Sequence, residues 1–194
     1  MRVLVTGASG HVGGAAARLL ARQGHEVWGL SRTPADAAVH HVPVDLARPG
    51  CAAQTTDAAP PCAAIVHAGA CLSKAPEDRA VVDVNCHGTQ AMLALAKTWG
   101  TETFIFVSGV GILGVPQSLP VTEEHPACPP SAYAASKRFG EHLTRLAGEG
   151  GSLRAVTLRL SSPVGPGLRQ RTIFRIFAEH ALRGAPLLLH GAGA

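Results

Sequence analysis

The sequence predicts an α/β fold in which helices cover both faces of a doubly wound parallel sheet, in three layers. Two observations predict it. Short apolar, strand-like runs alternate with longer helix-like runs along the 194 residues, and the first strand-like run leads through three spaced glycines into a helix-like run. The composition agrees, because 46% hydrophobic and 15% charged residues suit a sheet that is buried on both faces.

The elements can be justified in chain order. Apolar runs rich in β-branched residues predict strands over 2–6, 26–30, 40–44, 63–68, 103–107 and 153–160. Helical periodicity predicts helices over 15–23, 77–99, 131–147 and 171–183. Gly24 and Gly100 are typical helix C-caps, and Ser131, after two prolines, is a typical N-cap. Residues 49–62 show little periodicity, so we expect a poorly helical crossover there.

The segment 7–13, Gly-Ala-Ser-Gly-His-Val-Gly, is typical of a nucleotide-binding turn between a strand and a helix. Gly7 permits the tight turn, and Gly10 lets backbone N–H groups approach a diphosphate. Gly13 lets the helix pack closely on the sheet. The alternative is a glycine-rich connection that binds no ligand.

Charge and composition exclude several classes of protein. The net charge of +4 comes mostly from scattered arginines, so no nucleic-acid partner is predicted. No apolar run is long enough to cross a membrane, and the chain begins directly with a strand, which predicts a cytoplasmic protein. The five cysteines form no Cys-x-x-Cys pair, so we expect reduced thiols and no metal site. His40-His41 could bind a metal, but a solvated pair is the simpler interpretation.

Two widely separated motifs carry a resemblance to a known family. The Gly-x-x-Gly-x-x-Gly turn after Thr6 and the segment Tyr133-Ala-Ala-Ser-Lys137 resemble the short-chain dehydrogenase/reductase superfamily. Two further segments, His67-Ala-Gly-Ala and Val84-Asn-Cys-His-Gly-Thr, resemble its extended branch, the NAD-dependent epimerase/dehydratase family. The resemblance implies a Rossmann fold and an NAD(P)-dependent oxidoreductase, or an epimerase or dehydratase that uses the same hydride internally.

The resemblance also implies roles for particular residues. Tyr133 would be the acid/base, and Lys137 would favour its phenolate and hold the nicotinamide ribose. Asn85 would serve as a polar group near the active site, although a position on a solvated helix face is the alternative. Gly109 stands where the family carries its catalytic hydroxyl. Either the backbone bends there to present Ser108, or polarisation of the substrate is weakened.

The cofactor site implied by the resemblance extends over several loops. At the end of the second strand, Ser31 and Arg32 would suit the 2′-phosphate of NADP, so we expect NADP rather than NAD. A solvent-facing Arg32 is the alternative. The full set of implied cofactor-binding residues is Gly7, Ser9, Gly10, His11, Val12, Gly13, Ser31, Arg32, Asp45, Leu46, His67, Ala68, Gly69, Tyr133, Lys137, Ser161, Pro163 and Val164.

The end of the chain bears on domain organisation. The segment Arg159–Gly167 resembles the turn that leads from the cofactor into the substrate lobe, although Leu160 replaces the usual proline. We therefore expect a dinucleotide-binding domain over 1–167 and the start of an incomplete substrate lobe over 168–194, with most of that lobe missing. The expected partners are a small carbonyl, alcohol or nucleotide-sugar substrate and a second copy in a homodimer. A non-catalytic NAD(P)-binding or sensor protein, or an incomplete reading frame, remains an alternative.

Overall fold

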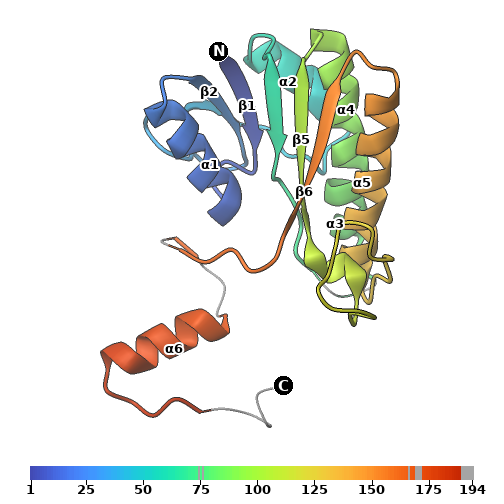
Figure 1. Ribbon diagram of the computed structural model, residues 1–194. Coiled ribbons are helices and arrows are strands. Elements are labelled where there is room, and N and C mark those ends of the chain that lie inside the picture. Colours follow the sequence, from blue (N-terminus) through green and yellow to red (C-terminus); the bar gives the residue numbers. More distant parts are fainter. Residues whose placement is uncertain (74, 76, 166, 169–171, 189–194) are drawn as a thin grey trace. The chain divides into compact units, whose positions relative to one another are not determined.

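The computed structural model describes residues 1–194 apart from 74, 76, 166, 169–171 and 189–194 (Figure 1). The chain divides into two compact units, Met1–Ser161 and Ser162–Ala194. The second unit contains the helix α6 (Ile173–Leu182), whose N-cap Thr172 accepts a hydrogen bond from the amide of Arg175. Pro166 and residues 189–194, within the two segments expected to lead into and begin the substrate lobe, lie outside the described residues.

The first unit is built on a six-stranded parallel sheet with the order β3-β2-β1-β4-β5-β6, which is the order of a Rossmann fold. Its strands are β1 (Arg2–Thr6), β2 (Glu26–Leu30), β3 (His40–Val42), β4 (Ala64–His67), β5 (Thr103–Gly109) and β6 (Arg154–Leu160). The strand order reverses between β1 and β4, so the carboxyl ends of these two strands border a crevice where such folds bind ligands.

Helices lie against both faces of this sheet (Figure 1). The helix α1 packs on β1 and β2, whereas α4 packs on β4 and α5 packs on β5 and β6. The helical elements of this unit are α1 (His11–Arg22), α2 (Cys51–Ala58), α3 (Arg79–Val81), the π-helical turn η1 (Val82–His87), α4 (Gly88–Trp99), the 3₁₀ turn η2 (Val110–Leu113) and α5 (Ala132–Glu149).

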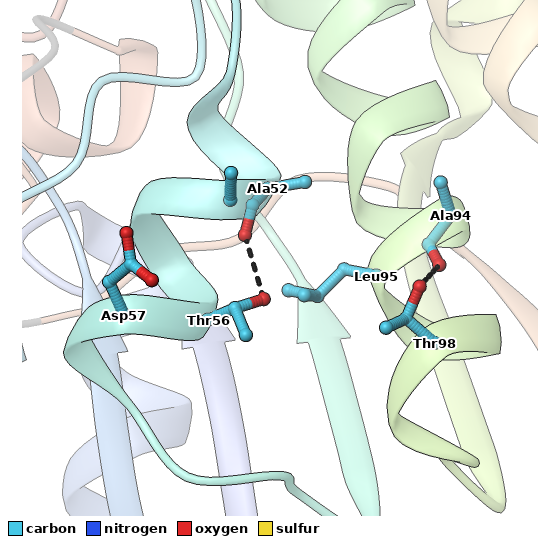
Figure 2. A pocket seen from close by; sticks show the side chains of 7 residues that line it. Ala52, Thr56, Asp57, Ala94, Leu95 and Thr98 are labelled. Atoms are coloured by element: carbon cyan, nitrogen blue, oxygen red, sulfur yellow. Dashed lines mark hydrogen bonds between the residues drawn. The ribbon is translucent and has the colours of Figure 1, made fainter.

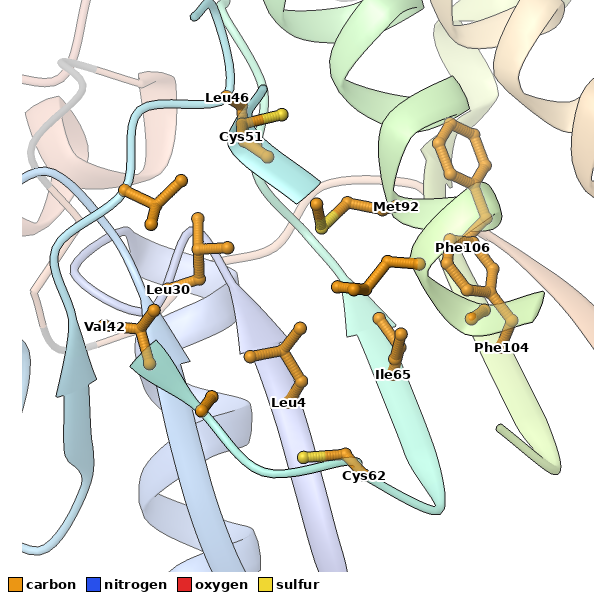
Figure 3. Close-up of a cluster of buried hydrophobic side chains, with 14 residues drawn as sticks. Leu4, Leu30, Val42, Leu46, Cys51, Cys62, Ile65, Met92, Phe104 and Phe106 are labelled. Atoms are coloured by element: carbon orange, nitrogen blue, oxygen red, sulfur yellow. The ribbon is translucent and has the colours of Figure 1, made fainter. Parts of the chain in front are cut away.

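Alternating side chains of the strands form two apolar cores. The larger core, drawn in Figure 3, lies between the sheet and the helices α2 and α4, and includes Leu4, Ile65, Met92, Phe104 and Phe106, all of them fully buried. The smaller core lies under α1 and is built from Val3, Val5, Ala17, Val27, Val39 and Ala64. Neighbouring residues of β1 therefore serve opposite faces, as the period of a strand requires.

The structure differs from the sequence prediction at several boundaries. The crossover that we expected to be poorly helical contains α2, because Cys51 and Thr55, four residues apart, are both buried and Thr55 Oγ1 donates to the Cys51 carbonyl at 2.7 Å. The helix expected over 77–99 includes the π-helical turn η1. His40 and His41 lie in β3, where His40 stacks on Trp28. Within the described residues, no helix is long and apolar enough to span a bilayer.

Candidate active site

The glycine turn brings β1, β4 and α1 together at the carboxyl edge of the sheet. Gly7 has a φ of +67°, which favours glycine, and a Cβ there would lie 2.8 Å from the Gly69 Cα. A Cβ on Gly13 would lie 2.4 Å from the Gly7 carbonyl oxygen and 2.9 Å from the Thr6 carbonyl oxygen. Only glycine lets α1 approach β1 this closely, because both obstacles are backbone.

The first turn of α1 leaves donors available for an anion. Gly10 is the N-cap and supplies no side chain to cap the helix. Its own amide donates to the Gly7 carbonyl at 2.8 Å, and the Gly14 amide donates to the Gly10 carbonyl at 2.9 Å. Among the described residues, no backbone acceptor pairs with the amides between them, those of His11, Val12 and Gly13. These amides and the positive end of the helix dipole fit a diphosphate group.

His67, at the end of β4, is fully buried and connects the glycine turn to α4. Its Nδ1 lies 2.9 Å from Thr6 Oγ1, and its Nε2 lies 3.0 Å from Thr89 Oγ1. Thr89 donates its own proton to the Asn85 carbonyl at 2.6 Å, so it must accept from His67 Nε2–H. Nδ1 then accepts the Thr6 hydroxyl proton, which requires a neutral imidazole. Burial accordingly lowers the pKa of His67 to about 3, with a smaller contribution from the Lys137 charge.

Asn85, in the π-helical turn η1, fastens the loop after β4 to α5. Its Oδ1 accepts from the Cys71 amide at 2.8 Å, and its Nδ2 donates to the Cys71 carbonyl at 3.0 Å. Nδ2 also donates to Ser136 Oγ at 2.9 Å, and Ser136 donates to the Tyr133 carbonyl at 2.7 Å. Asn85 is buried, and its Oδ1 and Nδ2 are both used in these hydrogen bonds, so its side chain joins the loop after β4 to α5.

Tyr133 and Lys137 lie one turn apart on α5, whose N-terminus is capped by the predicted Ser131, with an Ala134 amide to Ser131 Oγ distance of 3.2 Å. Lys137 is 3% exposed, and its Nζ lies 4.1 Å from the centroid of the Phe106 ring. Burial lowers the pKa of Lys137 to about 8, while the Glu141 charge raises it. Burial raises the pKa of Tyr133, because a buried site disfavours the charged phenolate.

Gly109 continues β5 without a bend. It has extended backbone angles, φ −151° and ψ 150°, and pairs with Leu160 of β6. Ser108 lies on the same face of β5 as Phe106 and is buried beneath α5. Its hydroxyl is close enough to Glu141 to help lower the pKa of the Glu141 carboxyl group, although no well-aligned hydrogen bond joins the two side chains. The strand geometry therefore directs Ser108 toward α5 and leaves no side chain at position 109.

The remaining predicted residues occupy separate places. Asp45 follows β3, where its Oδ1 caps the Ala47 amide at 3.0 Å, and Leu46 packs into the larger core. Gly69 donates its amide to Thr6 Oγ1 at 2.9 Å, which places the loop after β4 beside the glycine turn. Ser161 is exposed just after β6, whereas Pro163 and Val164 belong to the second unit, so their cofactor contacts stay a prediction.

The sequence patterns assigned no role to four residues that the structure shows as hydrogen-bond partners of one another or of predicted residues. They are Thr89, Ser136, Glu141 and Arg159. Each lies inside or close to a motif that was noticed for another reason. Thr89 ends the Asn85 segment, and Ser136 immediately precedes Lys137. A buried polar side chain needs a partner, but which strand supplies that partner is decided by the tertiary fold.

A hollow of about 360 Å³ lies elsewhere, between α2 and α4 (Figure 2). Its two threonine hydroxyls are already used within their own helices, because Thr56 donates to the Ala52 carbonyl and Thr98 to the Ala94 carbonyl, each at 3.1 Å. Alanine and leucine side chains provide most of the remaining lining. This hollow offers few polar groups to orient a ligand, in contrast to the glycine turn. Within the described residues, no cluster of three or more metal-ligating side chains occurs.

Comparison with known proteins identifies the family. The model of the NAD dependent epimerase/dehydratase family matches residues 3–194, and the chain belongs to that family. A 2'-dehydrokanamycin reductase from Streptomyces kanamyceticus is 31% identical over 100% of this chain and 53% of its own length. The chain thus spans about half the length of this curated relative.

Solved structures show the same fold with a cofactor. A short-chain dehydrogenase/reductase superfamily protein from Agrobacterium tumefaciens with bound NAD is 36% identical, with a TM-score of 0.75 over 82% of this chain and 48% of its own. The UDP-glucose 4-epimerase of Thermus thermophilus, a complex with NAD, is 31% identical, with a TM-score of 0.81 over 96% of this chain and 64% of its own.

The expectation of NADP is wrong. The family is NAD dependent, and three neighbouring structures at 28–36% identity hold NAD. The structure supplies a reason why Ser31 misled the prediction: its side chain is buried, and its hydroxyl proton is already donated to the Thr33 carbonyl at 2.7 Å. Arg32 is exposed to solvent, which was the alternative interpretation of that residue.

Proposed function

We propose that this chain binds NAD at the glycine turn and supplies the acid/base of a hydride-transfer reaction at a hydroxyl or carbonyl carbon. One observation carries the proposal. A continuous set of hydrogen bonds runs from the Gly69 amide through Thr6, His67, Thr89 and Asn85, and then through Ser136 to the Tyr133 carbonyl. It links the carboxyl end of β1, beside the glycine turn, to the helix that carries Tyr133 and Lys137.

The residues present fit NAD. The amides of His11, Val12 and Gly13 would hold the diphosphate, and the absence of side chains at Gly7 and Gly10 leaves room for it. Lys137 would donate to the nicotinamide ribose. When bound, NAD supplies the hydride acceptor and a positive charge. Tyr133 would move the proton between its phenol oxygen and the substrate oxygen, since the charge of oxidised NAD together with Lys137 opposes the effect of burial on the phenol pKa.

For the substrate, we propose a sugar, free or carried on a nucleotide. The relatives support this class by their names. Besides the Streptomyces reductase, they include a UDP-glucose 4-epimerase of Rhizobium leguminosarum that is 33% identical over 87 residues and a dTDP-4-dehydrorhamnose reductase of Burkholderia thailandensis that is 35% identical over 143 residues. Residues 168–194 would begin the lobe that binds this substrate, as the sequence predicts.

A second candidate is a protein that binds NAD without turnover, and Gly109 favours it. An extended glycine at the end of β5 offers no hydroxyl to polarise a substrate carbonyl. Loss of one such donor typically costs about 10²-fold to 10³-fold in rate. The two candidates agree on NAD binding and differ only in chemistry.

The deciding experiment compares the unaltered chain with Tyr133→Phe. Calorimetric titration measures NAD affinity, and NADH formation or consumption is followed with a panel of sugar alcohols, sugar ketones and nucleotide sugars. The proposal expects both proteins to bind NAD with similar affinity and only the unaltered chain to turn over. Binding without turnover in either protein would select the second candidate, and no NAD binding would refute both.

We also propose that α5 contributes to a homodimer. Phe139 and Leu146, seven residues apart on that helix, are each 45% exposed and share one helical face. Sedimentation velocity of the unaltered chain and of Phe139→Glu tests this, with Arg145→Glu on the same helix as the matched surface change. A dimer that dissociates only in Phe139→Glu supports the proposal, and a monomer throughout contradicts it.

A further inference from the structure

Glu141 is a buried carboxylate on the same helix as the two candidate active-site residues. It is 4% exposed, and two arginines contact it. Arg159 of β6 donates to both of its oxygens at 2.9 Å through Nε and Nη2, and Arg138 donates to one oxygen at 3.2 Å. Arg159 also donates to the Glu123 carbonyl at 3.2 Å. The group therefore fastens α5 to β6 and to the loop that precedes α5.

Lys137, one turn before Glu141, is a buried cation with no carboxylate within ion-pair distance among the described residues. Its ammonium lies over the Phe106 ring, whose face attracts a cation only modestly. Burial of an isolated ammonium costs more than this attraction supplies, so its charge needs additional support. Residues four apart on a helix share a face, and Glu141 is the anion on that face.

We propose that Glu141 is a positioning residue for Lys137: its buried carboxylate, held by Arg159, keeps the ammonium charged and seated over Phe106. Arg159 has the opposite effect on the lysine, because its guanidinium neutralises part of the carboxylate charge. The direction of the Glu141 contribution to the pKa of Lys137 agrees with this assignment. The inference rests on the proposed function only in giving Lys137 a ribose to hold.

The other charged groups around Lys137 leave Glu141 as the anion that can act on it. From β4, His67 is neutral. From η1, the Asp83 carboxylate is already paired with Arg79 and His87, each at 3.4 Å. The strand β5 contributes the uncharged Ser108, and β6 contributes Arg159. The helix α5 itself contributes Tyr133 and Arg138. The helices α3 and α4 also pack on α5, with Arg79 and the exposed Lys97 as their cations.

The test measures the titration of Lys137 directly in the unliganded protein. The chain has only three lysines, Lys74, Lys97 and Lys137, so nuclear magnetic resonance of isotope-labelled lysine side chains gives a readable spectrum. Lys137→Met assigns the signal. The midpoint is then followed from about pH 6 to about pH 11 in the unaltered chain, Glu141→Gln, Arg159→Gln and the double variant.

The two single variants have opposite expected effects. In Glu141→Gln the Lys137 midpoint falls by about one pH unit or more, because an anion is lost. In Arg159→Gln it rises, because the Glu141 charge is no longer shared. If Glu141 and Arg159 only hold the helix in place, both variants loosen the packing, expose the lysine and raise its midpoint together, which would overturn the proposal.

The double variant keeps the test decisive if a single variant does not fold, because it leaves no unpaired buried charge from the pair. A midpoint between those of the two single variants is expected, and one shifted below that of Glu141→Gln would also overturn the proposal. Should Glu141→Gln alone fail to fold, a midpoint in the double variant that lies below that of Arg159→Gln supports the assignment and an equal one contradicts it. Because no NAD is present, the result does not depend on the proposed activity.

Discussion

Lowering the pH from 7 to 5 should weaken this fold through His67 alone by about 2 kcal/mol. The imidazole must stay neutral in the folded protein, where its pKa is about 3, while in the unfolded chain it is about 6.5. Between these values the unfolded state binds more protons, so the free energy of unfolding falls as the pH falls. The stabilisation is fully present above pH 6.5 and is lost progressively toward pH 3, for a total of about 5 kcal/mol.

The assay is urea unfolding of the unaltered chain and of His67→Gln at several pH values between 7 and 5. Glutamine does not titrate, so the variant starts less stable at pH 7 and the difference between the two proteins shrinks by about 2 kcal/mol by pH 5. His142→Gln, at an exposed position of α5, is the matched control and should follow the unaltered chain. A difference that stays constant with pH would refute the argument that the Thr6 and Thr89 hydroxyls enclose a neutral imidazole.

Three further predictions concern glycines. Gly13→Ala should lower NAD affinity at least about 100-fold (~2.7 kcal/mol), because its Cβ would lie 2.4 Å from the Gly7 carbonyl oxygen. Gly150→Ala is the control, because a Cβ there has nothing within 4 Å, and equal NAD affinities of the two variants in titration would contradict the role given to the glycine turn. Gly109→Ser should raise turnover by about 10-fold or more, since its Cβ meets only the Leu160 oxygen at 3.5 Å; an unchanged initial rate would show that no hydroxyl is needed there. Gly140→Ala, whose Cβ would lie 2.3 Å from the Phe106 ring, should lower the free energy of unfolding by about 1–3 kcal/mol, and urea midpoints matching the unaltered chain would contradict it.

Local patterns were sufficient for the sheet and for the long helices, because each of these elements had its own signal. The strands of the sheet could be placed from apolar runs, and Gly100 ends α4 in the left-handed conformation that its sequence position suggests. The crossover 49–62 was misjudged, because α2 is stabilised by two buried residues against α4 rather than by an apolar stripe of its own. Tertiary packing overrides weak periodicity in such a segment.

The cofactor preference failed for a similar reason. Ser31 and Arg32 carry groups that can bind phosphate, and the residue types alone gave no reason to discount them. The direction of the Ser31 hydroxyl, toward the Thr33 carbonyl, depends on how the chain turns after β2. Residue type predicts which contacts are possible, and only the backbone path decides which are made.

By itself, the sequence determined the parallel α/β class, the glycine turn and the pairing of Tyr133 with Lys137 on one helix, because these depend on spacing within a single segment. Only the tertiary structure decided that His67 is neutral, that Asn85 serves the loop after β4, and that Glu141 meets Arg159 across 18 residues of chain. Such contacts join segments that are distant in the sequence, and their energy comes from burial and from the low dielectric of the core, which no local pattern encodes.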